Sequence, residues 1–365
     1  MTYALTSNGC DTLRDTIISS LLHTFDEHGI TRSRDTNGIQ FVIHPIDASS
    51  PAPYRRRSQS VIVISIVRIR SRPDDLKGFC YTTLIRSLSN LLVCIVAPDG
   101  VTTPSDAEVY FTTPEAGFYG VTYDDHTLFS KIYPIATAHY STANTLVDDL
   151  PERYWSGSPK VDELRTYARE LDTLGVLPTP FPLRELLPEA DMRHLYRMFG
   201  MTGLSYGNLS VRERIPGFSE RSFWMTARGV DKAHLGPVGR DILLVRSFSY
   251  DEGTAHISMP PDGWPKARVS VDAVEHAMIY DRYPDVGAIV HVHAWMDDIV
   301  STRQNFPCGT RELAQEVSDL LAQTADPRRA VAGLKNHGIT VTGVDLEDIF
   351  RRLRQHLLTE VPMYS

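Results

Sequence analysis

His291 and His293 stand two residues apart directly after the apolar stretch 286–290, and their spacing could support metal chemistry. The apolar stretch predicts a β-strand. Residues two apart in an extended chain point to the same side, so both imidazoles would face a single cation. Taken alone, the pair fits hydrogen-bonded core histidines as well as it fits metal ligands.

Polar residues on both sides of this strand strengthen the metal hypothesis. Residues 270–282 have helical spacing, with Asp272 and His276 one turn apart on the same stripe. After the strand, His337 lies between two short apolar runs within residues 334–343. Three histidines and a carboxylate form a standard ligand set for a divalent transition metal that leaves room for a substrate oxygen. The sequence therefore predicts a metal site made of histidine and carboxylate.

The chain from about residue 183 to residue 365 resembles the class II aldolase/adducin family. Four motifs carry the resemblance, in the family's order: residues 206–212, 225–232, 270–293 and 336–338. The resemblance implies an α+β fold with a central, mainly antiparallel sheet flanked by helices. It also implies a homo-oligomer, usually a tetramer, with active sites between subunits.

The resemblance assigns roles to the candidate metal site. His291, His293 and His337 match the family's metal ligands, and zinc is the usual metal, with Fe²⁺ or Mn²⁺ as alternatives. Asp272 matches the family's acidic residue and becomes the catalytic proton carrier. The aldolases have glutamate at this position, whereas the ribulose-phosphate epimerase has aspartate. The side chain here is shorter by one methylene, so the aldolase mechanism is not inherited unaltered.

The same resemblance points to a substrate-binding group formed by Gly207, Asn208, Arg228, Gly229 and Ser270. In sugar-phosphate members the corresponding turns surround a phosphate. Here Arg228 replaces a small or hydroxyl residue, and valine follows Ser270 where the family has a second serine. Because arginine binds carboxylate and phosphate alike, the substrate anion could be either. The glycines and the asparagine also fit ordinary turn residues.

These features predict a zinc-dependent lyase that acts through a metal-stabilised enolate on a small anionic hydroxy-carbonyl compound, by aldol cleavage or decarboxylation. An epimerase of the ribulose-phosphate-epimerase type needs the same stabilised carbanion and is one alternative. An Fe(II)-dependent oxygenase on the same fold is another, since histidines and a carboxylate can hold Fe(II) with open positions. A non-catalytic scaffold is disfavoured, because adducins do not keep the histidine ligands that this chain retains.

The preceding half of the chain carries no catalytic motif. Residues 11–28 have the spacing of an amphipathic helix, and residues 38–46 and 60–72 predict strands. Residues 81–96 predict a helix that runs into a strand. We expect a separate α+β domain of unknown function, with a mostly antiparallel sheet and helices on one side.

The length of 365 residues favours two domains. Turn-forming residues and a proline-rich segment place the boundary between them. We expect an N-terminal domain over residues 1–155, a linker and helix over 156–182, and the aldolase-like domain over 183–365.

Composition limits the partners and the compartment. The net charge of −8 disfavours general binding to nucleic acid or to a membrane surface. The four cysteines lie far apart with no CxxC pair, which indicates neither a disulfide framework nor a thiolate zinc site. No signal peptide or membrane-spanning stretch is evident. We therefore expect a soluble cytoplasmic protein that acts on a small molecule.

Overall fold

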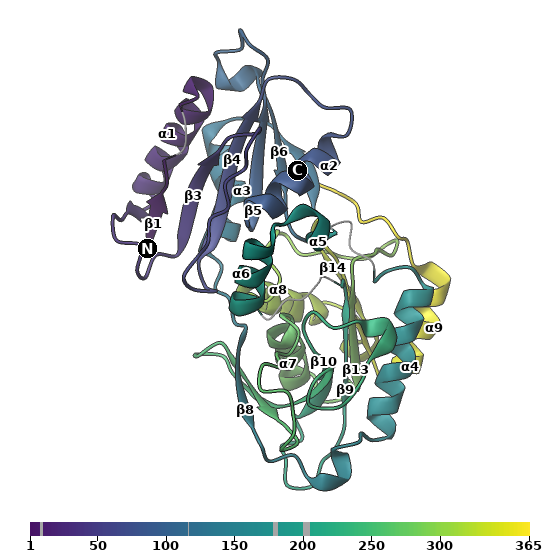
Figure 1. The fold of residues 1–365 in the computed structure, drawn as a ribbon. Coiled ribbons are helices and arrows are strands. Elements are labelled where there is room, and N and C mark those ends of the chain that lie inside the picture. The colour runs from purple at the N-terminus through teal and green to yellow at the C-terminus, as the bar shows by residue number, and fades with distance from the viewer. Residues whose placement is uncertain (8–9, 116, 178–181, 200–204) are drawn as a thin grey trace. The chain divides into compact units, whose positions relative to one another are not determined.

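The computed structural model describes residues 1–7, 10–115, 117–177, 182–199 and 205–365 (Figure 1). The chain divides into two compact units. The N-terminal unit comprises Met1–Ala138, Phe181–His194 and Met363–Ser365, and the C-terminal unit comprises His139–Pro180 and Leu195–Pro362. Over the described ranges, no helix has both the length and the apolar character that crossing a membrane requires.

The N-terminal unit contains a sheet with the strand order β2-β1-β3-β4-β5-β6-β7. The strands from β2 to β5 pair in parallel, and β6 and β7 continue the sheet antiparallel. The expectation of a mostly antiparallel sheet is therefore wrong. Its strands are β1 (Thr2–Leu5), β2 (Thr31–Arg32), β3 (Phe41–Ile46), β4 (Ile62–Ile69), β5 (Leu91–Val96), β6 (Glu108–Thr112) and β7 (Phe118–Val121).

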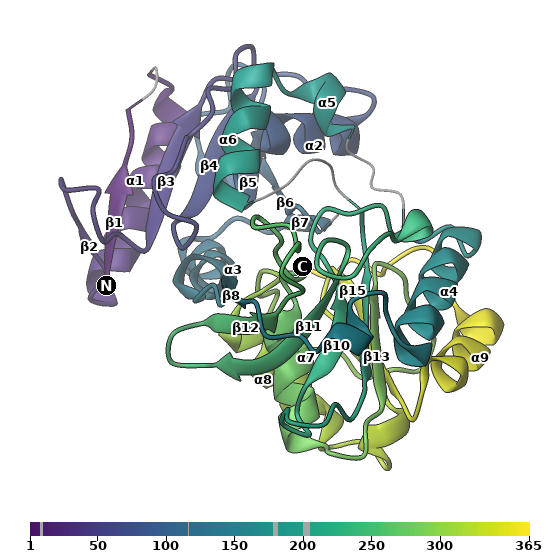
Figure 2. The same cartoon turned by 60° about the horizontal axis from the view of Figure 1, so that its bottom comes forward.

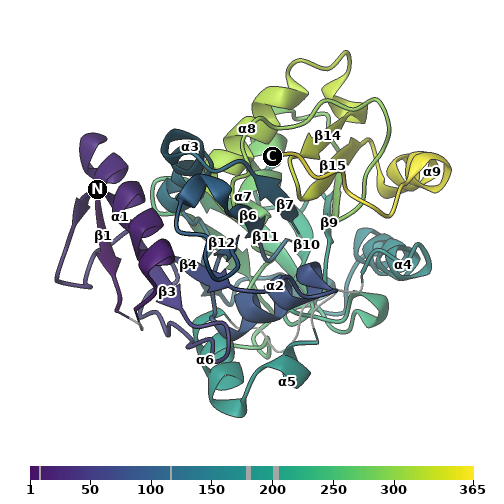
Figure 3. The same cartoon turned by 90° about the horizontal axis from the view of Figure 1, so that it is seen from above.

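Helices cover both faces of this sheet, and not one face as expected (Figure 3). On one face, α2 packs against a cluster that includes Leu92 and Cys94 of β5. On the other, Phe25 of α1 contacts Phe41 of β3 and Phe129 of α3. Burial on both faces explains why β4 and β5 are almost continuously apolar, which is typical of parallel strands. The helices of the unit are α1 (Thr12–Glu27), α2 (Leu76–Arg86), α3 (Asp125–Thr137), α5 (Leu183–Leu186) and the start of α6 (Glu189–Phe199).

The C-terminal unit contains a second sheet, in the order β14-β15-β13-β9-β10-β11-β12-β8. All pairs are antiparallel except β12 with β8. The predicted mainly antiparallel sheet is confirmed. Its strands are β8 (Ala143–Val147), β9 (Asn208–Arg212), β10 (Phe223–Thr226), β11 (Ile242–Ser249), β12 (Thr254–Ser258), β13 (Ala288–Val292), β14 (Val331–Leu334) and β15 (Gly338–Gly343). β8 falls inside the range 1–155 expected for the first domain, yet it forms an edge of this sheet.

Two pairs of helices cover the two faces of the second sheet (Figures 1 and 2). One face carries α4 (Pro159–Thr173) and α9 (Leu346–His356), and the other carries α7 (Ala273–Arg282) and α8 (Arg311–Leu321). Short 3-10 helices join the elements of the chain: η1 (Pro104–Asp106), η2 (Glu152–Tyr154), η3 (Lys232–His234) and η4 (Pro327–Arg329).

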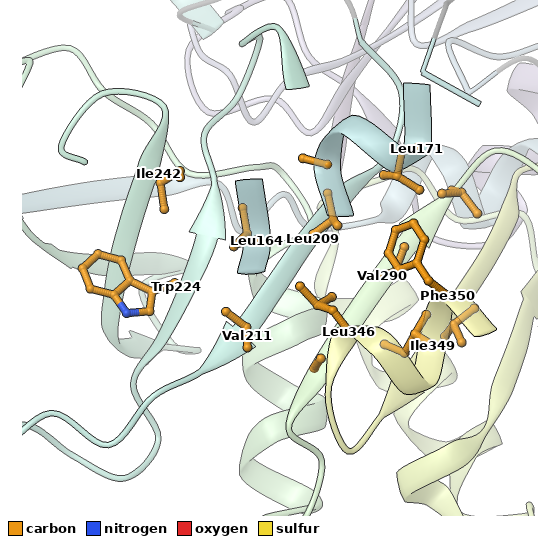
Figure 4. Packing of buried hydrophobic residues seen from close by; sticks show 14 of the residues in the cluster. Leu164, Leu171, Leu209, Val211, Trp224, Ile242, Val290, Leu346, Ile349 and Phe350 are labelled. Carbon is orange, nitrogen blue, oxygen red and sulfur yellow. The ribbon is translucent and has the colours of Figure 1, made fainter. Parts of the chain in front are cut away.

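A large apolar cluster lies beneath α4 and α9 (Figure 4). Leu209 of β9 and Val290 of β13 project to this face, where they meet Leu171 of α4 and Phe350 of α9. Because side chains alternate along a strand, Ser210 and His291 project to the opposite face, toward α7. The face under α7 and α8 has its own apolar cluster, and it also carries these buried polar groups.

Replacing Phe350, which is fully buried, should therefore destabilise the C-terminal unit. We expect Phe350→Ala to lower its free energy of unfolding by about 3–5 kcal/mol, because the cavity adds to the lost burial. All four tryptophans (Trp155, Trp224, Trp264 and Trp295) lie in this unit, so denaturant unfolding followed by tryptophan fluorescence reports on it. The neighbouring exposed residue provides the control: Arg351→Ala should change the value by no more than about 0.5 kcal/mol. Equal effects of the two changes would contradict this packing.

Candidate metal centre

Three histidines come together from the end of strand β13 and from the turn between β14 and β15. His291 is the penultimate residue of β13, which lies between β9 and β15, and His293 follows directly after the strand ends. His337 lies in the tight turn between β14 and β15. A central strand and a short hairpin are rigid supports, and rigid supports suit ligands that must keep a fixed geometry.

The backbone of the hairpin explains why asparagine and glycine flank His337. Asn336 has a φ of +57°, a left-handed conformation that asparagine tolerates better than most residues. A Cβ atom at position 338 would lie 2.2 Å from the carbonyl oxygen of Val292, so only glycine fits there. Gly338 thereby allows β15 to begin close enough to β13 for His337 to reach His293.

The three imidazoles lie close together. Their ring centroids lie 4.6–5.1 Å apart, and Nε2 of His293 is 3.2 Å from Nε2 of His337. His291 donates from Nδ1 to the carbonyl oxygen of Ile339 at 3.1 Å, which leaves Nε2 as its lone-pair nitrogen. That Nε2 atom is buried and has no hydrogen-bond partner among the described residues.

Burial lowers the pKa of His291, and it holds the pKa of His337 well below the usual range. Both rings are therefore neutral at pH 7, which is the form that binds metals. A buried nitrogen without a partner, beside further neutral imidazoles, fits a divalent transition metal.

Asp272 precedes α7, but its side chain does not cap that helix. Asn208 donates from Nδ2 to Oδ2 of Asp272 at 2.6 Å, and Cys308 donates from Sγ to Oδ1 at 3.1 Å. Asn208 pairs with His291 across β9 and β13, so the sheet itself brings the asparagine to the metal centre. The carboxylate is buried and held by two donors beside the histidines.

Cys308 is a residue of the centre that sequence analysis missed. Its Sγ lies 3.8 Å from Nε2 of His337. His291, Cys308 and His337 each offer one ligand atom, and these atoms lie within 4.8 Å of one another. The cysteine spacing indicated no thiolate metal site, and a ligand role for Cys308 is taken up as a proposal below. The only sequence feature around Cys308 is the turn-forming run of proline, cysteine and glycine before α8. Such a run is too common to indicate a metal ligand.

Gly207 and Gly229, two of the five predicted substrate-binding residues, have clear backbone roles. Both have positive φ angles, of +71° and +69°. A Cβ atom on Gly207 would lie 2.9 Å from the carbonyl oxygen of His291. The residue before β9 must therefore be glycine for the chain to lie this close to β13. Asn208 orients Asp272, as described above. Contact of these residues with a substrate stays a prediction.

The other two, Arg228 and Ser270, lie close to this region of the fold. The backbone N–H of Ser270 donates to the carbonyl oxygen of Thr226 at 3.3 Å, and Ser270 stands two residues before Asp272. Arg228 is partly exposed, but its Nε is buried with no hydrogen-bond partner among the described residues. Burial and the neighbouring Arg268 lower the pKa of Arg228 to about 10. A guanidinium in this situation is suited to binding an anion.

Two further buried charged groups were not predicted. Lys232 donates from Nζ to the carbonyl oxygen of Ser205 at 3.0 Å, and burial lowers its pKa to about 8. Glu275 accepts a hydrogen bond of 2.6 Å from the Thr340 hydroxyl. Burial and the charge of Asp272 raise the pKa of Glu275 to about 8. One sequence feature could have indicated Glu275: it stands three residues after Asp272, and residues i and i+3 share a helix face.

The helical stripe through His276 has a structural use. His276 shares a hydrogen bond of 2.7 Å with the Ser210 hydroxyl, and Ser210 shares one of 2.8 Å with the hydroxyl of Tyr280. The chain of polar contacts fixes α7 on β9 and so holds Asp272 in place.

Comparison with known proteins identifies the region that holds most of this centre. The model of the Class II Aldolase and Adducin N-terminal domain family matches residues 190–307. This region belongs to the class II aldolase/adducin family. The matched range contains Asp272, His291 and His293, whereas Cys308 and His337 lie beyond its end.

Curated relatives and solved structures also match part of the chain. Methylthioribulose-1-phosphate dehydratases from two strains of Leptospira biflexa serovar Patoc are 32% identical over 127 residues, which is 34% of this chain and 52% of theirs. The chain thus spans about half the length of these relatives. Among solved structures, YgbL from Escherichia coli is 17% identical with a TM-score of 0.34, covering 53% of this chain and 83% of its own. An aldolase II superfamily protein from Pseudomonas syringae is 15% identical with a TM-score of 0.36, covering 57% and 73%.

The raised pKa of Glu275 makes a pH dependence of stability testable. Its ordinary value is 4.5, so the native state binds the extra proton between about pH 4.5 and pH 8. Stability arising from this group is complete below pH 4.5 and is lost as the pH rises toward 8. In chelator-treated protein, Glu275→Gln should gain stability relative to the parent chain over that interval, by up to about 1.4 kcal/mol per pH unit.

Denaturant midpoints measured across this pH range provide the check. Gln can still accept the hydrogen bond from Thr340, and the exposed Asp297→Asn change serves as a control. A difference between variant and parent that stays constant with pH would show that Glu275 is already ionised in the native state.

Proposed function

We propose that this protein is a metal-dependent lyase whose C-terminal unit acts on a small anionic hydroxy-carbonyl compound. Membership of the class II aldolase/adducin family supports lyase chemistry in general. The observation that carries the proposal is the convergence of His291, His293 and His337 beside the hydrogen-bonded carboxylate of Asp272. Zinc is the metal that this proposal assigns to the histidines.

A divalent cation at this position would supply Lewis-acid stabilisation of negative charge that develops on a substrate oxygen. In this proposal Asp272 accepts a proton from the substrate, and the hydrogen bond from Asn208 orients Oδ2. Because Asn208 holds the carboxylate by this hydrogen bond, the orientation of Asp272 is set before the substrate reacts. Proton transfer by a positioned group of this kind contributes about 10²–10⁴-fold to rate.

Arg228 is proposed to hold the substrate's anionic group. Its buried Nε is available within the described structure, and Lys232 adds a second cation in the same region, where it interacts with Asp272. In the dehydratases of Leptospira biflexa the named substrate carries a phosphate. We therefore propose a phosphorylated keto-sugar as the first substrate class to test, and dehydration or aldol cleavage as the reaction.

Removing a histidine ligand should remove the metal. Purified full-length protein reconstituted with zinc and then dialysed should retain close to one zinc ion per chain by elemental analysis. His291→Ala and His337→Ala should weaken zinc binding by more than about tenfold, because each loses a nitrogen donor. His23→Ala, which changes an exposed histidine of α1, is the control and should bind zinc like the parent. A parent protein that retains no divalent metal would overturn the proposed function.

Asp272→Asn should separate proton transfer from metal binding. The amide keeps the size of the side chain but cannot accept the substrate proton, so turnover should fall by about 10²–10⁴-fold while zinc content is unchanged. The assay combines product formation from methylthioribulose 1-phosphate and other ketose phosphates with solvent-deuterium exchange at the carbon next to the carbonyl. Asp297→Asn, in an exposed turn after the ligands, should leave both readouts unaltered. Full exchange in the Asp272 variant would assign the proton transfer to another group.

A further inference from the structure

The geometry points to Cys308 as a sulfur ligand of the metal that His291 and His337 hold. This inference rests on the proposed function, because it requires a bound metal. It goes further by assigning to this chain a donor set of mixed histidine and thiolate character, in which Asp272 receives the thiol proton.

The distances suit direct ligation. The Sγ atom of Cys308 is 3.8 Å from Nε2 of His337, and the three ligand atoms of His291, Cys308 and His337 lie within 4.8 Å of one another. Zinc–sulfur and zinc–nitrogen bonds are about 2.3 Å and 2.0–2.1 Å long. A sulfur and a nitrogen that bind the same zinc ion are therefore separated by less than the sum of these two lengths. A cation placed between Cys308 and His337 therefore needs little or no movement of either side chain.

A second observation points to a ligand at the same place. Nε2 of His291 is buried, belongs to a residue that is 2% exposed, and has no hydrogen-bond partner among the described residues. A buried polar atom without a partner costs free energy unless something binds it. The ligand atoms of His291, Cys308 and His337 can all offer lone pairs. A single cation can bind all three atoms, whereas a single hydrogen-bond donor could bind only one of them.

The loop before α8 holds Cys308 in position. Gly309 has a φ of +75°, and a Cβ atom there would lie 3.0 Å from the carbonyl oxygen of Val271, the residue before Asp272. The Thr310 hydroxyl donates to the carbonyl oxygen of Pro307 at 2.7 Å, and the N–H of Ser141 donates to the carbonyl oxygen of Gly309 at 2.9 Å. Backbone contacts on both sides of Cys308 thus fix its sulfur beside Asp272.

The proton of the thiol has a defined destination. Cys308 donates its S–H hydrogen bond to Oδ1 of Asp272 at 3.1 Å. When the metal binds, the S–H bond breaks, its electron pair forms the sulfur–metal bond, and the proton moves to Asp272 and from there to solvent. Asn208 continues to donate to Oδ2 of Asp272 after the thiol proton has left, so the carboxylate keeps its orientation. Thiolate donors favour zinc or cobalt over magnesium and manganese.

Cobalt substitution tests the sulfur ligand directly. Full-length protein is stripped of metal and loaded with Co²⁺, whose thiolate complexes absorb in the near ultraviolet by charge transfer from sulfur. The parent and Cys10→Ser, which changes an exposed cysteine, should show this band. Cys308→Ser should bind Co²⁺ through its histidines, keep the visible bands of the ion and lose the charge-transfer band. Zinc X-ray absorption of the unaltered chain should independently show one sulfur scatterer at about 2.3 Å.

The outcomes separate the two proposals. A parent protein that binds Co²⁺ and zinc but shows neither the band nor the sulfur scatterer overturns the ligand role of Cys308 and leaves the metal enzyme standing. A band that persists in Cys308→Ser also overturns that role. A parent protein that binds no metal at all overturns the proposed function, and the sulfur ligand with it. The X-ray measurement does not depend on whether the variant folds.

Discussion

The close approach of backbone to both sides of β13 is the constraint on which the metal centre depends. Gly207 meets the carbonyl oxygen of His291 and Gly338 meets that of Val292, at separations that leave no room for a side chain. These contacts let the β9 entry and the β14–β15 hairpin crowd around the end of one strand. Asn208 and His337 arrive beside His291 and His293 as a result. Any larger residue at either glycine would push one of these groups away.

The close packing around the end of β13 also affects the charges of the buried groups near Asp272. The region encloses two basic groups, Arg228 and Lys232, whose pKa values are lowered because little water reaches them. Of the two acidic groups, Glu275 has a pKa of about 8 and is largely protonated at pH 7. Among these four groups, positive charge therefore exceeds negative charge even without a metal. In a poorly hydrated region this excess of positive charge is weakly screened, and it suits a substrate that carries an anionic group.

The features that the sequence predicted correctly are those encoded by motifs and short-range patterns. The antiparallel sheet of the C-terminal unit and the family were predicted because four ordered motifs carry them. The pair His291 and His293 is a local signal of this kind, whereas His337, 44 residues beyond His293, was added through the family motif, and the structure brings the three together. The direction of β3 to β5 was predicted wrongly, because an apolar run shows burial but does not show which strand lies beside it. Cys308 was missed for a related reason: its place beside Asp272 depends on a loop packing against a helix 36 residues away in sequence.

The edge strand β8 gives the C-terminal unit an unexpected beginning. It pairs with β12 over its whole length, and the residues just before it support the centre: Ser141 binds Gly309, and the carbonyl oxygen of Thr142 faces Arg228. A fragment that started at the expected boundary near residue 156 would lack all of these groups. Its β12 would then present an open row of backbone donors and acceptors, which invites pairing between copies and aggregation. The smallest piece able to carry the chemistry therefore has to start near residue 139, well inside the half of the chain that bears no motif.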